Sequence, residues 1–438
     1  MAQDQTKDKG PLVARRGAVE LIDAVLAQRK TLDEAMANVR SFNSLDGSDR
    51  SFAAYIARMI LRRQGQIDAL IDHCLSSPLP KKASGVRDCL RVGIAQLFFS
   101  ATADHAAVST TVDLCRAFGF QAYAKLVNAV MRRLQREGET LIGSQDAARL
   151  NTPGWMFKSW TAAYGENTAR AIAEVHLATP PIDLTPKSDA AGWVGKLSGE
   201  VVLGGSIRLA QESEAVTSLE GFEEGAWWVQ DAAARLPVSI AGDLQGKTAF
   251  DLCAAPGGKT LALAAAGAKV TALDISEKRL RRVQENLTRT GLTAEIVTAD
   301  VRKWDAPGKA DVVLLDAPCS ATGTIRRHPD SLHLKSASDV EKLTIVQSAL
   351  LEKAAEFVTP GGLLIYATCS LQPEEGAERV EAFLKDNPRF VRVPISAGEI
   401  GGFGDAITPS GDLRTLPCHL AEIGGLDGFY TARLRLQS

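Results

Sequence analysis

FDLCAAPGGKT, residues 250–260, is the most informative segment for the fold of the second half of this chain. It runs from apolar residues into a glycine pair and then into a helical pattern. A continuous apolar run is typical of a strand that is covered on both faces, as in a parallel sheet. Two glycines at the turn let the backbone approach a ligand closely, and the helix that follows directs its first amide groups there. The stretch therefore predicts an α/β sheet with a ligand loop at one strand end.

The pattern around this stretch alternates between strands and helices. Apolar runs occur at 248–253, 269–273, 311–315 and 363–367, with helical stretches between them at 259–266, 277–290 and 339–357. Alternating residues at 429–436 predict a late strand. We expect residues 231–438 to form a Rossmann-like α/β domain with a mostly parallel sheet.

The first part of the chain has a different pattern. Over residues 10–140, apolar residues recur at helical spacing and almost no strand pattern occurs, which predicts an all-α bundle of five to seven helices. Residues 150–230 predict a small α+β linking segment, helical over 151–178 and followed by short strands near 182–184 and 201–203. We therefore expect three segments, 10–140, 150–230 and 231–438.

Composition and charge limit the class of protein. The 438 residues are 45% hydrophobic and 23% charged, which excludes a disordered, collagen-like or disulfide-stapled chain. The net charge of −2 argues against a nucleic-acid partner when it is taken over the whole chain. Residues 1–150, however, carry 21 Lys and Arg against 16 Asp and Glu, and the remainder carries 29 against 36. A basic first part joined to an acidic second part is compatible with a polyanion-binding half.

The cysteines and the start of the chain indicate a compartment. Seven cysteines without metal-type clustering predict reduced thiols and no bound metal. The polar N-terminus is not followed by an apolar signal core, and no run approaches the roughly 20 apolar residues that span a bilayer. We expect a cytoplasmic protein that binds neither membrane nor metal, and a monomer.

Acidic residues follow three of the predicted strands. Asp274 ends the second strand, Asp300 follows a third strand at 295–298, and Asp316 ends the fourth. One such Asp is commonly a helix N-cap, but three at the carboxyl ends of parallel strands line one crevice. The glycine loop lacks both the G-x-G-x-x-G pattern and the Walker spacing. The pattern favours an adenosyl cofactor without phosphate over a bound nucleotide.

Two cysteines stand where strands should end, Cys319 in DAPCS and Cys369 in ATCS. A single cysteine is most often a small buried apolar residue. Because both follow strands at the edge that carries the acids, both are candidates for the same crevice, where a thiolate is a strong nucleophile. Cys253 also ends a strand, but its place before the glycine turn favours packing beneath the cofactor.

The motifs CAAPGGKT, DAPCSATGT and ATCSLQPEE, together with Asp274 and Arg279, resemble those of the RNA 5-methylcytosine methyltransferases of the Sun/Fmu type, which use S-adenosylmethionine. In the first part, DHAAVST and AKLVNAVMRRL resemble the NusB-type RNA-binding bundle. The resemblance spans nearly the whole chain and is thinnest at 140–220. It implies a class I methyltransferase domain behind a NusB-like domain, with 16S ribosomal RNA as the partner.

The resemblance also implies roles for the site residues. Cys369 would attack carbon 6 of a cytosine, Asp316 would hold the Watson–Crick edge and help protonate the ring nitrogen, and Cys319 would assist release of the adduct. Candidate S-adenosylmethionine contacts are Cys253, Ala254, Ala255, Pro256, Gly257, Gly258, Lys259, Asp274, Arg279, Asp300 and Asp316. Lys259 is equally explained as a solvated lysine at a helix start. Arg279 is equally explained as a surface base, like Arg281 and Arg282.

Basic residues provide candidate RNA contacts, and two departures from the family concern the same function. The candidates are Arg132, Arg133, Arg136, Arg326 and Arg327, each of which is also explained as a solvated surface charge. The departures are Ser331-Leu332-His333, where the family has a segment containing Trp, and Gly376, where the family has Asn after Pro-Glu-Glu. We expect both to lie where target RNA passes.

Three classes of function compete. The leading one is carbon-5 methylation of cytosine in ribosomal RNA, with transfer RNA or another ribosomal RNA as the alternative substrate. A non-catalytic RNA-binding or antitermination factor does not need two thiols at strand ends. A small-molecule methyltransferase leaves the basic helical bundle without a role.

Overall fold

The computed structural model describes residues 10–210 and 215–438. They divide into two compact units, each of which is described by itself. The helical unit contains the described residues up to Lys158, together with His176–Ala178 and His328–Lys335. The sheet unit contains Ser159–Val175, Thr179–Arg327 and Ser336–Ser438. The three segment boundaries expected from the sequence stay predictions.

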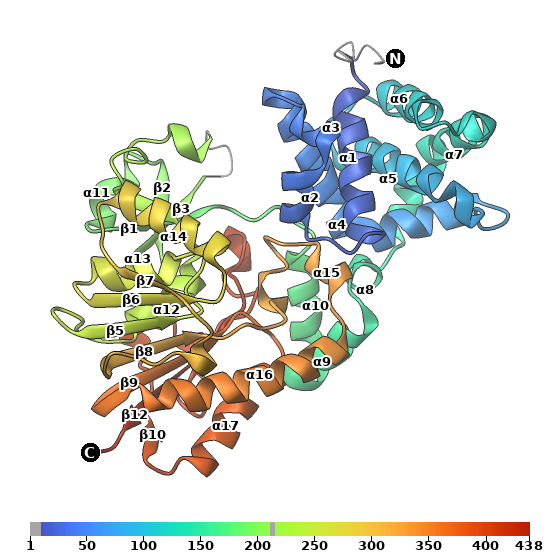
Figure 1. The fold of residues 1–438 in the computed structure, drawn as a ribbon. Coiled ribbons are helices and arrows are strands. Elements are labelled where there is room, and N and C mark those ends of the chain that lie inside the picture. The colour runs from blue at the N-terminus through green and yellow to red at the C-terminus, as the bar shows by residue number, and fades with distance from the viewer. Residues whose placement is uncertain (1–9, 211–214) are drawn as a thin grey trace. The chain divides into compact units, whose positions relative to one another are not determined.

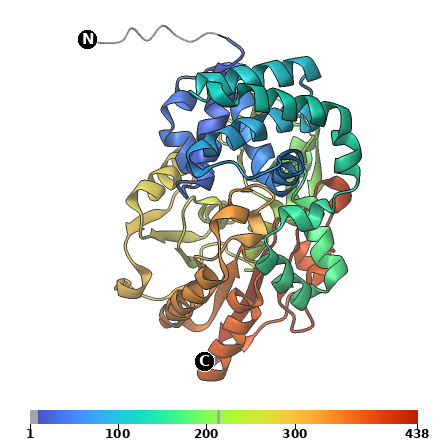
Figure 2. The same ribbon diagram turned by 90° about the vertical axis from the view of Figure 1, so that its right-hand side faces the viewer.

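The helical unit is all-α, as predicted from the sequence, and its helices lie side by side around one core (Figure 2). They are α1 (Val13–Leu26), α2 (Leu32–Asn38), α3 (Arg40–Asn43), α4 (Gly47–Cys74), α5 (Ser84–Phe99), α6 (Asp104–Ala117), α7 (Ala124–Gly143), α8 (Ala147–Asn151) and α15 (Ser331–Leu334).

Local sequence explains two features of this unit. The Thr31 hydroxyl accepts a hydrogen bond from the amide of Glu34, and the Glu34 carboxylate accepts one from the amide of Thr31, a capping box that begins α2. Gly93 lets α5 approach α6, because a Cβ at this position would lie 2.2 Å from Oγ1 of Thr111.

The segment Ser331–Leu334 does not lie on an open surface. Ser331 and Leu332 are buried, and Nε2 of His333 is 2.7 Å from the carbonyl oxygen of Leu61 within the helical unit. The backbone amide of Leu32 donates to Asp330. The segment packs into the helical unit, and the expectation that it lies where target RNA passes stays a prediction.

The main sheet of the sheet unit has the mostly parallel arrangement predicted from the sequence. Its strands are β5 (Thr248–Leu252), β6 (Lys269–Asp274), β7 (Glu295–Thr298), β8 (Ala310–Asp316), β9 (Val358–Thr368), β10 (Phe390–Arg392), β11 (Leu413–Arg414) and β12 (Tyr430–Leu436). The order is β10-β12-β9-β8-β5-β6-β7, with β11 paired to β12 (Figure 1). Strands β5 to β9 are parallel, and β12 is antiparallel to β9.

Helices cover both faces of this sheet, which explains why the strands are apolar throughout. One core joins the sheet to α12 (Ala232–Ser239), α13 (Gly258–Ala265) and α14 (Glu277–Thr290). The other core joins it to α16 (Ala337–Glu356) and α17 (Ala377–Asp386). Each face therefore buries a separate set of strand side chains.

A smaller antiparallel sheet with the order β2-β3-β1-β4 precedes the main one. Its strands are β1 (Asp183–Pro186), β2 (Gly199–Val202), β3 (Ser206–Leu209) and β4 (Trp227–Val229), and α11 (Ala190–Val194) packs against it. Helices α9 (Gly154–Tyr164) and α10 (Glu166–Val175) precede it in the chain. This α+β character was predicted from the sequence. Arg208 and Asp183 form a buried ion pair, with Nε 2.8 Å from Oδ1, that joins β3 to β1.

Candidate active site

The site lies at the carboxyl edge of the parallel strands. Strand β5 lies between β6 and β8, so the order of the strands changes direction at β5: β6 and β7 lie on one side of it, and β8 and β9 lie on the other. Such a switch in strand order opens a crevice at the carboxyl ends, where ligands bind in α/β folds. Cys253, Asp274, Asp316 and Cys369 end or directly follow strands at this edge, as the sequence predicted.

The glycine loop between β5 and α13 has an unusual backbone. Cys253 has φ +64° and Gly257 has φ +106°, and a residue with a Cβ is strained at such angles. The amide of Ala254 donates to the carbonyl of Leu273 on β6, which ties the loop to its neighbouring strand. Gly258 then begins α13, whose first amide groups face the crevice.

Asp274 is a buried anchor for this loop. Its Oδ2 accepts from the amide of Ala255 at 3.3 Å, and its Oδ1 accepts from the amide of Ser276 at 2.9 Å. Arg279 pairs with the same carboxylate at 2.7 Å, although the arginine side chain is 56% exposed. Arg279 is thus a surface arginine that neutralises Asp274.

Asp300 lies just beyond β7 and caps the short 3-10 helix Val301–Lys303. Its Oδ1 accepts from the amide of Arg302, and the Arg302 side chain pairs with Oδ2 at 2.6 Å. The hydrogen bond from the Arg302 side chain lowers the pKa of Asp300, so this group stays ionised.

Lys259 is buried and not a solvated lysine at a helix start. Its Nζ lies 2.7 Å from Oδ2 of Asp316 and 4.9 Å from the ring centre of Phe429. Burial lowers the pKa of Lys259, but the charge of Asp316 and its hydrogen bond outweigh burial, so the pKa is raised. Lys259 therefore keeps its charge and is a fixed ion-pair partner for Asp316, whose side chain is 29% exposed.

Cys319 and Cys369 are brought together, with their Sγ atoms 3.4 Å apart. All seven cysteines of the chain are free thiols. The hydrogen bond with Cys369 and then burial raise the pKa of Cys319 well above its usual value. Cys319 therefore holds its proton more firmly than an ordinary thiol does.

Glu375 joins the two cysteine loops, and the sequence analysis assigned it no role. The buried carboxylate accepts from the amide of Ser320 at 2.9 Å, from Nε2 of Gln347 at 3.0 Å and from Oγ of Ser370 at 2.5 Å. The hydroxyl of Ser320 donates to it as well. Since Ser320 and Ser370 each follow one of the cysteines, Glu375 holds the two thiols in register. The motif ATCSLQPEE contains Glu375, but sequence spacing could not indicate where its side chain points.

Asp251 is a second functional candidate that sequence reasoning missed. It is fully buried on β5, and its Oδ2 accepts from the hydroxyl of Thr260 at 2.6 Å. Among the residues that the structure describes, its Oδ1 has no hydrogen-bond partner. Burial raises the pKa of Asp251 to about 7.

The predicted RNA contacts have different surroundings. Arg132, Arg133 and Arg136 lie on α7 of the helical unit, where Val127, Val130, Met131 and Leu134 form the buried face. Arg132 and Arg136 are exposed, and Arg133 pairs with Glu137.

Arg326 and Arg327 belong to the sheet unit and differ from each other. The Arg326 side chain is 1% exposed and pairs with Asp231 and Asp427, so it has no accessible face for an RNA phosphate. The sequence prediction for Arg326 is corrected on this ground: it is an internal ion-pair residue. Arg327 pairs with Asp427 but stays partly exposed.

Gly376, the second departure from the family pattern, is buried beside β12. A Cβ at this position would lie 2.7 Å from Nη2 of Arg414 and 2.9 Å from Cγ of Tyr430. A side chain at position 376 would collide with Arg414 and Tyr430, which explains the glycine. Because Gly376 is buried, it offers no surface to RNA.

The loop and the strand ends fit an adenosyl cofactor. Asp274 supplies a carboxylate at the second strand end, and Asp251, on the strand that leads into the loop, has an Oδ1 without a hydrogen-bond partner among the described residues. No group of His, Cys, Asp and Glu that could hold a metal ion occurs in the described ranges. No helix within them is long and apolar enough to cross a membrane.

Comparisons with known proteins agree with this geometry. Residues 242–435 match the family model described as 16S rRNA methyltransferase RsmB/F, and residues 12–136 match the NusB family. The chain is 34% identical over 403 residues to a Ribosomal RNA small subunit methyltransferase B from Shewanella oneidensis, covering 89% of this chain and 91% of that protein. It is 37% identical over 442 residues to the protein of that name from Pseudomonas putida, covering 96% and 98%.

Solved structures share the fold. The structure described as PH0851 covers 98% of this chain with all of its own length, at a TM-score of 0.74 and 24% identity. A methyltransferase homolog from Pyrococcus horikoshii covers 64% of this chain with 93% of its own, at a TM-score of 0.52 and 26% identity.

Proposed function

The chain belongs to the RsmB/F family of 16S rRNA methyltransferases, and we propose that it methylates carbon 5 of a cytosine in 16S ribosomal RNA through a covalent adduct with Cys369. Methyl transfer to ribosomal RNA with S-adenosylmethionine as the methyl donor is the activity of the family. The position on the base, the adduct and the RNA are the proposed parts.

The observation that carries the proposal is the thiol pair beside a carboxylate. Cys319 and Cys369 follow the neighbouring parallel strands β8 and β9, with their sulfur atoms 3.4 Å apart, and Asp316 is the last residue of β8. Carbon 5 of cytosine is a poor nucleophile until a group adds to carbon 6. A thiolate with a second thiol at hydrogen-bond distance supplies that addition and its reversal.

Cys369 is the nucleophile in this scheme. Its thiolate bonds to carbon 6, and the electron pair of the 5,6 double bond moves to carbon 5, which takes the methyl group. Loss of the carbon-5 proton to solvent re-forms the double bond and expels the Cys369 sulfur. Cys319, which keeps its proton, donates a hydrogen bond to the departing sulfur and so assists release.

Asp316 orients the base. As a carboxylate it accepts a hydrogen bond from the exocyclic amino group at the Watson–Crick edge. The ammonium group of Lys259 is 2.7 Å away, so a proton can pass through Asp316 to the ring nitrogen as negative charge develops and return by the same path.

The cofactor is proposed to lie along the glycine loop. S-adenosylmethionine supplies an electrophilic methyl group on a positively charged sulfur. Residues Cys253–Lys259 would follow its length, Asp274 would bind the ribose hydroxyls, and Asp300 would lie near the adenine. Asp316 would lie close to the methionine end, and Arg279 would act through Asp274.

The RNA must present an accessible base. A cytosine within a helix is stacked, so we expect a single-stranded or flipped-out target. Arg132, Arg133 and Arg136 on the helical unit are proposed phosphate contacts. Cytoplasmic location is part of the proposal, since free thiols persist in a reducing compartment.

Labelled S-adenosylmethionine and ribosomal RNA from cells that lack this protein test the proposal. The expected result is label in 16S RNA, recovered as 5-methylcytosine after nuclease digestion. Label on another base or another position would refute the chemistry. Label on transfer RNA alone would refute the substrate.

A further inference from the structure

The chain leaves strand β9 through residues Cys369–Gln372, which we call the exit segment. The carbonyl of Cys369 accepts from the amide of Gly323 at 2.9 Å. The amide of Leu371 donates to Oγ1 of Thr322 at 2.9 Å. Both partners belong to the loop that follows β8, so this loop is the first anchor of the exit segment.

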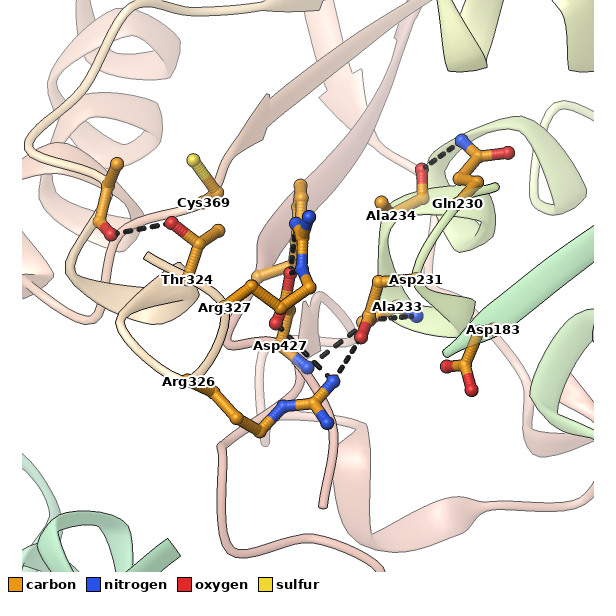
Figure 3. A network of polar contacts seen from close by, with 12 residues as sticks. Asp183, Gln230, Asp231, Ala233, Ala234, Thr324, Arg326, Arg327, Cys369 and Asp427 are labelled. Carbon is orange, nitrogen blue, oxygen red and sulfur yellow. Dashed lines mark hydrogen bonds and ion pairs between the residues drawn. The ribbon is translucent and has the colours of Figure 1, made fainter. Parts of the chain in front are cut away.

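The loop that follows β8 is itself fixed (Figure 3). The hydroxyl of Thr324 donates to the carbonyl of Ala321 at 3.0 Å, which closes the loop on itself. Nε of Arg327 donates to Oδ2 of Asp427 at 2.7 Å, and the Asp427 side chain is fully buried. The first anchor is therefore tied to the interior of the sheet unit.

The end of α9 is the second anchor. The hydroxyl of Tyr164 donates to the carbonyl of Leu371 at 2.5 Å. Nε1 of Trp160 donates to Oε1 of Gln372 at 2.9 Å, and Nε2 of Gln372 donates to Oγ of Ser159 at 3.1 Å. These residues of α9 belong to the sheet unit, as the exit segment does. Because Trp160 and Tyr164 are four positions apart in one helix, they reach the exit segment from the same helix face.

Burial makes hydrogen-bond partners necessary for this segment. Leu371 is 0% exposed and Gln372 is 2% exposed, and a buried peptide group without a partner is costly. Nη1 of Arg414 donates to the carbonyl of Ser370 at 2.5 Å. Burial raises the pKa of Tyr164, so its hydroxyl keeps its proton and stays a donor. The carbonyls of residues 369, 370 and 371 thus receive donors from the loop after β8, from β11 and from α9.

These anchors matter for the residue at the start of the segment. Strand β9 ends at Thr368, so the sheet fixes the chain only up to the residue before Cys369. The direction of the Cys369 side chain therefore depends on how the next peptide groups are held. A displacement of about 1 Å in a reacting group costs about 100-fold in rate.

We propose that Trp160 and Tyr164, at the end of α9, are positioning residues for Cys369. They act through Leu371 and Gln372 and keep the thiol directed at carbon 6 of the base. The inference rests on the proposed function in taking Cys369 as the attacking group. It gives the end of α9, in the region where the family resemblance is thinnest, a part in the reaction.

Tyr164→Phe tests the second anchor, because it removes the hydroxyl and keeps the ring. We expect kcat for RNA methylation to fall about tenfold, with unchanged KM for S-adenosylmethionine and for RNA. A merely structural tyrosine would lower the urea midpoint and leave kcat unchanged. Tyr55→Phe is the matched control, since the hydroxyl of Tyr55 also donates to a carbonyl, that of Phe99, at 3.3 Å within the helical unit. It should keep the wild-type kcat.

Hydrogen–deuterium exchange of the free protein gives a second readout, which needs neither RNA nor cofactor. The amides of Leu371 and Gln372 are hydrogen-bonded, to Oγ1 of Thr322 and to Oγ of Ser370. In Tyr164→Phe we expect the exit segment to exchange about tenfold faster, because its local opening becomes easier. The peptide that contains Thr248–Leu252 of β5 should exchange as in wild type, which separates local opening from a general loss of stability.

Ser159→Ala covers the case in which Tyr164→Phe does not fold. It removes a half-buried hydroxyl and one bond to Gln372, so we expect kcat to fall about threefold, again without a change in KM. Should it stand in for Tyr164→Phe, a wild-type kcat in Ser159→Ala would overturn the inference.

Two outcomes with folded Tyr164→Phe would overturn the inference. One is a wild-type kcat, whatever the change in stability. The other is a raised KM for RNA at unchanged kcat, which would make Tyr164 a substrate contact. Faster exchange of the exit segment in Tyr164→Phe, in a protein whose wild type forms no 5-methylcytosine, would support the anchoring of Cys369 by α9 and refute the proposed function.

Discussion

The sulfur of Cys319 lies 3.4 Å from the sulfur of Cys369, and the two thiols are chemically unequal. The hydrogen bond and burial together raise the pKa of Cys319, so one proton is held on that side of the pair. The roles that we propose follow this asymmetry, with Cys369 as the attacking thiol and Cys319 as the group that assists its departure.

Replacing the cysteines separately should give opposite results. Cys319→Ala removes the hydrogen bond to the departing sulfur, so we expect a covalent protein–RNA complex to accumulate. Cys369→Ala removes the nucleophile, so we expect none. The covalent complex is detected for each variant as a slowly migrating band on a denaturing gel with labelled RNA. Cys418→Ala, a control thiol without these contacts, should behave as wild type. A complex with Cys369→Ala and none with Cys319→Ala would exchange the two roles.

Glu375→Gln should separate the two cysteine loops. The carboxylate accepts from the amide of Ser320, from Gln347 and from Ser370, and an amide cannot accept all of these bonds. A buried polar group without a hydrogen-bond partner lowers the free energy of unfolding by roughly 1–3 kcal/mol, so the variant should unfold at a lower urea concentration. We also expect kcat to fall at least about tenfold with unchanged affinity for S-adenosylmethionine.

Glu374→Gln is the matched control for this change, since Glu374 is the exposed neighbour. It should leave both kcat and the urea midpoint unchanged. A wild-type kcat in Glu375→Gln would show that the register of the two loops does not limit the reaction.

The sequence predicted the strand ends well because period and composition report burial directly. The acids and cysteines that follow apolar runs lie at the expected edge of the sheet. What it could not predict is the direction of long side chains after a turn. Glu375 turns inward to two serines, and Arg326 turns inward to Asp231 although Arg327, one position later, stays partly exposed. These directions depend on tertiary partners that are distant in the chain, since Ser320 lies 55 positions from Glu375 and Asp231 lies 95 positions from Arg326.

Asp251→Asn should change how stability depends on pH. An ordinary carboxyl has a pKa near 4, and burial raises that of Asp251 to about 7. Between about pH 4 and 7 the folded protein therefore holds one proton more than the unfolded chain. This contribution to stability is full below pH 4 and is lost as the pH rises to 7. The asparagine side chain resembles the protonated acid but has no proton to lose in this pH range. The decrease in stability with rising pH that Asp251 causes should therefore be absent in Asp251→Asn.

The free energy of unfolding by urea at pH 5, 6, 7 and 8 measures this difference. Asp311→Asn is the contrasting control, because bonds from the amide and hydroxyl of Thr248 lower the pKa of Asp311. Its contribution is present above the ordinary carboxyl pKa and should not vary from pH 5 to 8. Parallel curves for wild type and Asp251→Asn would mean that Asp251 is ionised in the fold.

The arginines of α7 should contribute to RNA affinity through phosphates. Replacing Arg132, Arg133 and Arg136 together with Gln removes three charges from one exposed helix face. For single-stranded RNA the slope of log K against log salt should fall by about 2, and by less to the extent that Glu137 already neutralises Arg133. The matched control replaces Arg40, Arg50 and Arg116, three exposed arginines on other helices of the same unit. Equal slopes for the two triple variants would mean that only net charge matters, and that α7 is no specific RNA surface.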